Sequence, residues 1–120
     1  MPPRPPITPM EVEVRLLELA EELDEAQDLL AKAEVDYAQA EYDNRQALAQ
    51  ARLRIGNEER RTTDQQRKDE ATVFCKAEDF ALVMADARVR IARSTVFGIR
   101  TKIDVARSLG TSVRSAMEVV

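Results

Sequence analysis

Residues 16–51 read LLELAEELDEAQDLLAKAEVDYAQAEYDNRQALAQA, and mostly apolar side chains recur there every seven residues. Two such lines run along the segment: Leu16, Leu23, Leu30, Tyr37, Asn44 and Ala51, and, interleaved with them, Leu19, Ala26, Ala33, Ala40 and Ala47. This spacing is typical of a helix that presents one narrow apolar edge, here called a seam, to another helix. It predicts an all-α, coiled-coil-like fold and says little about activity.

A second seam with the same spacing follows in the carboxy-terminal half. Its members are Cys75, Leu82, Val89, Val96, Ile103, Gly110 and Met117, interleaved with Ala85, Ala92, Ile99, Ala106 and Val113. The polar segment that begins at Gly56 and Asn57 separates the two repeats. We therefore predict a helix over about 9–55, a turn over about 56–63 and a helix over about 64–117.

Local signals define the expected helix ends. Thr8 with Glu11, and Thr63 with Gln66, have the three-residue spacing of a capping box, in which side chains bond the free amides of a helix start. Gly56 is suited to a left-handed residue just past a helix end. Residues 1–8 are proline-rich and should form an extended arm, so the expected single domain is residues 9–118.

Two long helices with one short turn predict an antiparallel two-helix hairpin. The favoured register places Leu16 beside Ala106 and Leu23 beside Ile99, so that large side chains meet smaller ones. It also places the polar exceptions of the two seams, Asn44 and Glu78, together. A register shifted by seven residues ranks second.

The second helix carries another apolar line outside its seam. Together with its flanking residues this line is Phe74, Ala77, Ala81, Met84, Ile91, Gly98 and Val105. A helix with two apolar edges contacts two neighbours, so we expect these residues to form an oligomer interface in a four-helix-bundle homodimer. Arg88 and Lys102 lie at the edge of this line and count against the homodimer. The alternative is that this face binds a different protein.

Charge is distributed unevenly along a chain whose formal net charge is −4. Residues 11–43 hold twelve acidic side chains, whereas Arg93, Arg100, Arg107 and Arg114 form a basic line with seven-residue spacing. This line, with Arg60 and Arg61 of the turn, is the candidate nucleic-acid contact. We favour neutralisation by the first helix, which the register would achieve by bringing Glu22 near Lys102, Asp36 near Arg88 and Glu34 near Arg93.

The composition gives no support to a catalytic or metal site. The chain has no histidine and one cysteine, Cys75, which falls on the seam and is expected to be a small buried side chain. It has no glycine-rich phosphate loop and no nucleophile with a partner base. We expect neither enzymatic activity nor a cofactor or metal.

No apolar stretch approaches the ~20 residues of a membrane span, and the amino terminus lacks the apolar core of a signal peptide. We therefore expect a soluble, cytoplasmic protein without membrane contact, in the cytoplasm of the host cell if it is phage-encoded.

The segment from Gly56 through Thr63 to Arg67 and the closing RSLGTSVRSAM of residues 107–117 resemble small helical-hairpin proteins of phages and prophages, encoded near recombination or replication genes. This resemblance implies an accessory role and assigns no catalytic residue. The expected function is thus a non-enzymatic, homo-oligomeric adaptor that binds itself and another phage or host protein. Direct nucleic-acid binding is the first alternative, and a virion scaffold or assembly protein is the second.

Overall fold

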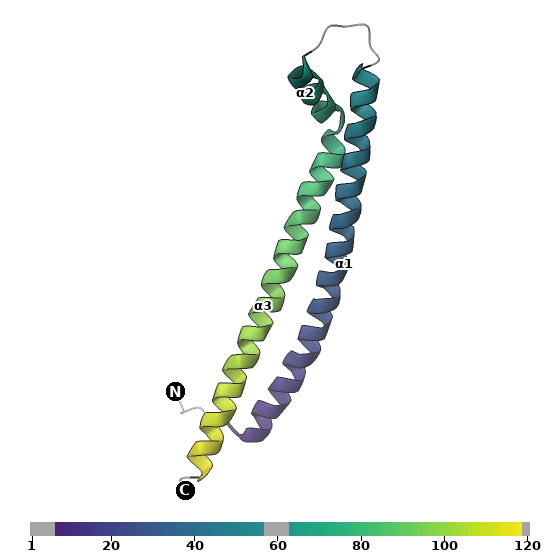
Figure 1. Ribbon diagram of the computed structural model, residues 1–120. Helices are drawn as coiled ribbons and strands as arrows, with labels where there is room; N and C mark the ends of the chain where they lie inside the picture. Colours follow the sequence, from purple (N-terminus) through teal and green to yellow (C-terminus); the bar gives the residue numbers. More distant parts are fainter. Residues whose placement is uncertain (1–6, 57–62, 119–120) are drawn as a thin grey trace, which may run out of the picture. The chain divides into compact units, whose positions relative to one another are not determined.

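The computed structural model describes residues 7–56 and 63–118, and these residues form three helices and no strand. The helices are α1 (Pro9–Gly56), α2 (Asp64–Phe74) and α3 (Lys76–Glu118) (Figure 1). The predicted all-α class is confirmed. The chain divides into two units, Met1–Leu30 with Ala92–Val120 (unit 1) and Ala31–Ile91 (unit 2), each of which is described by itself.

Helix α1 begins with the predicted capping box. The Glu11 amide donates to Thr8 Oγ1 at 3.2 Å, and the Thr8 amide donates to the Glu11 carboxylate at 3.4 Å. The Val12 amide donates to the Thr8 carbonyl at 3.2 Å and closes the first turn. These bonds satisfy amides that have no partner inside the helix, so they fix where α1 starts.

The expected end of the first helix needs a correction. Gly56 is the last residue of α1, and no described glycine has a positive φ, so the left-handed cap predicted there is wrong. Residues 57–62 of the predicted turn, and residues 1–6 of the predicted arm, lie outside the described part of the chain.

The helix predicted over 64–117 is interrupted at Cys75, which separates α2 from α3. Cys75 has φ −100° and ψ 22°, outside the helical range. Its amide still donates to the Ala71 carbonyl at 3.0 Å, and its carbonyl accepts from the Asp79 amide at 2.9 Å. The chain therefore leaves helical geometry at one residue, and the amide and carbonyl of that residue keep their hydrogen bonds.

The core of unit 1 consists of seam residues from α1 and α3, which run in opposite directions within this unit (Figure 1). The buried members are Leu19, Ala26, Val96, Ile99 and Ala106, and Leu16, Leu23, Leu30 and Ile103 pack against them. At one end, a Cβ built on Gly110 would lie 3.0 Å from Val12 Cγ1. This contact agrees with the predicted register at this end of unit 1, because Val12 and Gly110 are each four residues from Leu16 and Ala106.

Unit 2 has a thinner core made largely of small side chains. Its buried apolar residues are Ile55, Ala71, Cys75, Ala85 and Val89. Asn44 is also buried, with 9% of its surface exposed, and its Oδ1 has no hydrogen-bond partner in the part of the chain that the structure describes. The polar exception in the first seam is therefore inside the core and unsatisfied.

Candidate protein-interaction surface

Helix α3 has an uncharged side that points away from its seam. Two lines of residues with seven-residue spacing form it, and we call them together the outer face: Ala77, Met84, Ile91, Gly98, Val105 and Ser112, with Phe80, Ala87, Ser94, Thr101, Ser108 and Ser115. Ala87 and Gly98 are half-buried and the others are exposed. Since the lines are offset by three residues, they adjoin on the helix surface.

Large apolar side chains on the outer face are in contact with solvent. The exposed fraction is 66% for Phe80, 67% for Ile91 and 63% for Val105. Single exposed apolar residues are normal on a protein surface, whereas contiguous exposed apolar patches are typical of interaction sites, so the outer face is a candidate for one.

The structure places six of the seven predicted interface residues on α3. Ala77, Ala81, Met84, Ile91 and Val105 are exposed, and Gly98 is half-buried. Phe74 is the exception, because it is the last residue of α2 and the break at Cys75 removes it from the line of the others. It contributes to two shallow hollows in unit 2, of about 370 and 230 Å³.

The two glycines of α3 differ in what surrounds them. Gly110 is buried and faces Val12, so the packing of unit 1 accounts for its lack of a side chain. A Cβ on Gly98 would meet nothing within 4 Å. Glycine inside a helix costs about 0.5–1 kcal/mol relative to alanine, and no contact within the described chain offsets that cost at Gly98.

The polar groups of the outer face include a hydroxyl that is already bonded. Thr101 Oγ1 donates to the Phe97 carbonyl, one turn earlier in α3, at 3.0 Å. Threonine in a helix commonly bonds the carbonyl four residues before it, which turns the hydroxyl toward the backbone.

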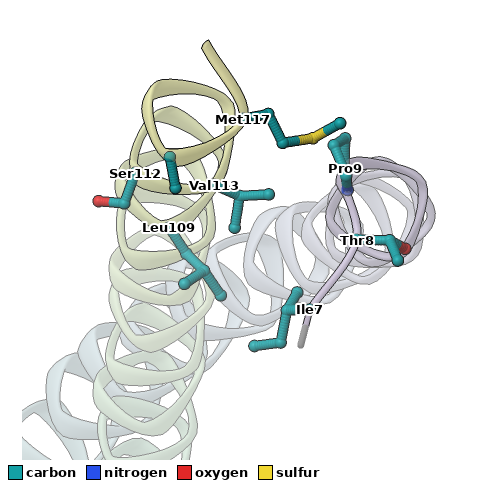
Figure 2. A pocket seen from close by; sticks show the side chains of 8 residues that line it. Ile7, Thr8, Pro9, Leu109, Ser112, Val113 and Met117 are labelled. Atoms are coloured by element: carbon teal, nitrogen blue, oxygen red, sulfur yellow. The ribbon is translucent and has the colours of Figure 1, made fainter. Parts of the chain in front are cut away.

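An apolar pocket of about 720 Å³ lies in unit 1, between the start of α1 and the end of α3 (Figure 2). Its described lining is Ile7, Thr8, Pro9, Leu109, Ser112, Val113, Ala116 and Met117, none of which is charged. Figure 2 shows Met117 reaching across toward Pro9, with Ile7 below them and Leu109 on the opposite wall. Ser112 belongs both to this pocket and to the outer face.

The basic line lies on another side of α3, and all four of its arginines are exposed. Arg114 Nε donates to the Gly110 carbonyl at 3.4 Å. Arg100 and Arg107 form no ion pair with any described residue. Arg60 and Arg61, the other candidate nucleic-acid contacts, lie outside the described residues.

The expected neutralisation by α1 is not seen at two of its sites. Glu22 Oε1 lies 3.7 Å from Arg15 Nη1 on its own helix, and Lys102 has no ion pair in the described part of unit 1. Asp36 and Arg88, described in unit 2, are not paired with each other either. Exposed pairs gain less than about 1 kcal/mol, so nearby carboxylates on the same helix compete on equal terms.

Cys75 is buried at the junction of α2 and α3. Burial raises the pKa of its thiol, and the carboxylates of Glu78 and Asp79 raise it further because they repel a thiolate. Reactive cysteines have the opposite environment, exposed and near positive charge. The thiol is therefore poorly suited to nucleophilic chemistry.

Two other kinds of site have no counterpart among the described residues. No group of three or more cysteine or acidic side chains there is arranged to hold a metal ion. None of the described helices combines the length and the apolar character that crossing a membrane requires.

Sequence reasoning missed part of the surface. Phe80 and the small residues beside it carry a detectable signal, since they repeat every seven residues without a charge. The pocket carried no such signal, because it depends on where Ile7 and Pro9 lie against the end of α3.

No protein-family model matches the chain, and neither a curated protein nor a solved structure matches it.

Proposed function

We propose that this protein is a non-enzymatic, homo-oligomeric helical adaptor. In this proposal α1 and α3 pair antiparallel over their whole length as one hairpin, and two hairpins join through the outer face of α3 into a four-helix bundle. The remaining helix surfaces then bind another protein. The outer face carries the proposal, because it has no charge and exposes the large apolar side chains of Phe80, Met84, Ile91 and Val105. In addition, its Gly98 is not accounted for by packing within the described chain.

Burial energetics favour covering this face. A fully buried side chain of the size of valine, isoleucine, methionine or phenylalanine gains about 1.5–3 kcal/mol over an exposed one. Phe80, Met84, Ile91 and Val105 are all exposed, with fractions from 39% to 67%. Covering them in both copies outweighs an association cost of about 4–15 kcal/mol only if several are buried together. A continuous contact along α3 meets that condition.

The test is the molar mass in solution, measured by sedimentation over a range of concentrations. The wild-type protein is expected to form a closed dimer. Val105→Lys, which places a charge on the outer face, should shift the equilibrium toward monomer. Val35→Lys on α1 is the matched control, because the same residue type has nearly the same exposure there, 68% against 63%. Equal effects of the two substitutions, or a wild-type monomer at every concentration, would contradict the proposal.

A phage or prophage origin and a link to DNA recombination or replication are part of the same proposal, and they rest on the resemblance of residues 107–117 and the segment around Gly56. The test is the identity of the neighbouring genes. Recombination or replication genes beside this one support the accessory role. Virion structural genes would instead favour a scaffold or assembly protein, which should form open polymers rather than a closed dimer.

One observation favours direct nucleic-acid binding as a second candidate function. Arg100 and Arg107 are exposed and unpaired among the described residues, as cations that contact phosphates would be. Arg100→Glu combined with Arg107→Glu should then abolish retention of short DNA and flatten its dependence on salt. Wild-type protein that does not bind DNA at low salt would eliminate this candidate and leave the adaptor function intact.

A further inference from the structure

One rim of the outer face has an ordered pattern of charge. The line beside Phe80 and Thr101 is Lys76, Val83, Arg90, Phe97, Asp104, Thr111 and Glu118, again seven residues apart on α3. Lys76 and Arg90, which precede Phe97, are positive. Asp104 and Glu118, which follow Phe97 by the same numbers of residues, are negative. A second copy of this rim that runs in the opposite direction therefore places an opposite charge beside each charge, with Phe97 at the centre.

Such a pattern distinguishes the two ways in which α3 can pair with a second copy of itself. In an antiparallel pair, equivalent rims of the two helices face each other. Arg90 then meets Asp104 of the second copy and Lys76 meets Glu118, each twice. In a parallel pair this rim faces the opposite one, Ala81, Arg88, Thr95, Lys102 and Leu109, which has no carboxylate. Flanking charges of this kind set helix orientation in coiled coils.

We propose that the outer face of α3 binds the outer face of a second copy in antiparallel orientation, with the two-fold axis at Phe97. This inference rests on the self-association in the proposed function and specifies its geometry. It commits the face to a second copy of this chain, because the rim charges complement each other within one sequence.

The side chains between the rims fit the same alignment. Ile91 lies opposite Thr101 of the second copy, and Met84 lies opposite Ser108. Phe80 lies opposite Ser112. A large side chain faces a small one in each case, as interdigitated packing requires. The antiparallel pair alternates sizes, whereas a parallel in-register pair would set Met84 on Met84 and Ser108 on Ser108.

Phe80 also gives the pocket of unit 1 an occupant. Ser112 lines this pocket, so the alignment brings the exposed ring of Phe80 from the second copy to its mouth. An aromatic ring is suited to a pocket whose described lining has no charge. The two symmetric pockets would anchor the ends of the contact, and the Phe97 pair would mark its centre.

The charges on the rim are available for this pairing. Lys76, Asp104 and Glu118 have no ion pair among the described residues, and Arg90 Nη2 lies 2.9 Å from Asp86 Oδ2 on its own helix, in an exposed pair. The other rim opposes the association, because it brings Arg88 near Lys102 of the second copy. The side chains of Arg88 and Lys102 are long enough to extend to water, which screens their repulsion. The four opposite-charge contacts on the first rim therefore outweigh the two like-charge contacts on this one.

Distance measurements between spin labels test the orientation directly. Labels are attached to Val83→Cys, Phe97→Cys or Thr111→Cys, one at a time, in a protein that also carries Cys75→Ala. Position 97 should give a short distance between copies, below about 20 Å. Positions 83 and 111 are each fourteen residues from the axis, so their distances should be about 40 Å at 1.5 Å per residue.

A dimer with short distances at all three positions would be parallel, which overturns this inference and leaves the proposed function standing. A protein without any distance between copies, and monomeric by sedimentation, would overturn the proposed function itself.

A charge exchange provides the second test. Arg90→Asp alone sets like charges together twice per dimer and should raise the dimer dissociation constant about tenfold. Adding Asp104→Arg should return it to within about threefold of wild type, since the exchanged pair is equivalent. Asp86→Ala is the control, because it removes only the pair within α3 and should leave the constant unchanged. Additive losses in the double variant would refute the contact between these two residues.

Discussion

Replacement of Asn44 by leucine should stabilise the protein. Asn44 is the polar member of an otherwise apolar line in α1, and its side-chain oxygen is buried with no hydrogen-bond partner among the described residues. Burying an unsatisfied amide is costly, whereas a leucine at this position would match Leu16, Leu23 and Leu30 of the same line.

Two favourable contributions and one cost determine the expected gain. Removing the buried, unpaired carbonyl recovers about 1–3 kcal/mol on the scale of protein mutational data. Leucine is larger than asparagine, and crowding in a packed site costs about 1–3 kcal/mol unless neighbours give way. Added burial of the leucine contributes roughly another 1.5–3 kcal/mol. We expect a net increase of about 1–3 kcal/mol in the free energy of unfolding of Asn44→Leu.

The assay is urea unfolding followed by circular dichroism at several protein concentrations, so that changes in self-association can be separated from changes in folding. Gln46→Leu is the control, because Gln46 is exposed and two residues away on the same helix. Its effect should stay within about 0.5 kcal/mol.

A second variant makes the result decisive. If leucine is too large for the site, Asn44→Ala removes the amide without crowding and should be neutral or stabilising. Losses of more than about 1 kcal/mol in both variants would refute the reasoning, since the amide would then contribute a favourable contact. A stabilised Asn44→Leu should also lose specificity of pairing, seen as mixed oligomers, because a polar seam residue disfavours shifted registers.

Three further outcomes are expected. Gly98→Ala should raise the free energy of unfolding by about 0.5–1 kcal/mol, because the added Cβ enters open space. Gly110→Ala should lower it by about 1 kcal/mol, because the added Cβ would lie 3.0 Å from Val12 Cγ1. Thermal unfolding of both variants at low protein concentration tests these two expectations. Cys75 should react slowly with iodoacetamide below its pKa, which lies above the ordinary 9.0. Because the unfolded thiol ionises first as pH rises, stability should fall between pH 8 and 10 more in the wild type than in Cys75→Ala, and an equal fall in both would contradict the raised pKa. Thr63→Ala should cost about 1 kcal/mol and speed amide hydrogen exchange in α2, since the Gln66 amide donates to Thr63 Oγ1 at 3.1 Å; unchanged exchange would show that the cap does not stabilise α2.

Helix starts and seam residues were predictable because they depend on interactions within a few residues or on a periodic pattern. Thr8 and Thr63 both form the capping bonds that their sequences indicate. The residues of the main core cluster of unit 1 are all members of the two seams. A seven-residue repeat specifies which side of a helix is buried, whichever partner covers it.

The interruption at Cys75 was not predictable from local signals. Neither glycine nor proline occurs between Asp64 and Phe97, and those residues are the usual markers of a helix end. Gly56 shows the converse, since it has the residue type of a helix terminator and yet remains helical. Cys75 is buried, and there packing rather than intrinsic preference determines the backbone.

The candidate surface was partly predictable for the same reason. The apolar line through Met84, Ile91 and Val105 is periodic and was found, whereas the pocket at Ile7 and Leu109 depends on the packing of distant segments. Two of the expected pairings between helices, Glu22 with Lys102 and Asp36 with Arg88, are not seen among the described residues, because exposed charges have several partners of similar energy within reach.

The hydroxyl of Thr101 influences how the outer face can be dehydrated. Because this group already donates to the carbonyl of Phe97, a covering helix does not have to supply an acceptor for it. Thr101 can therefore present its methyl group outward, as a valine would. Thr101→Val is accordingly expected to leave assembly unchanged, and shape rather than hydrogen-bonding capacity selects what lies against this position.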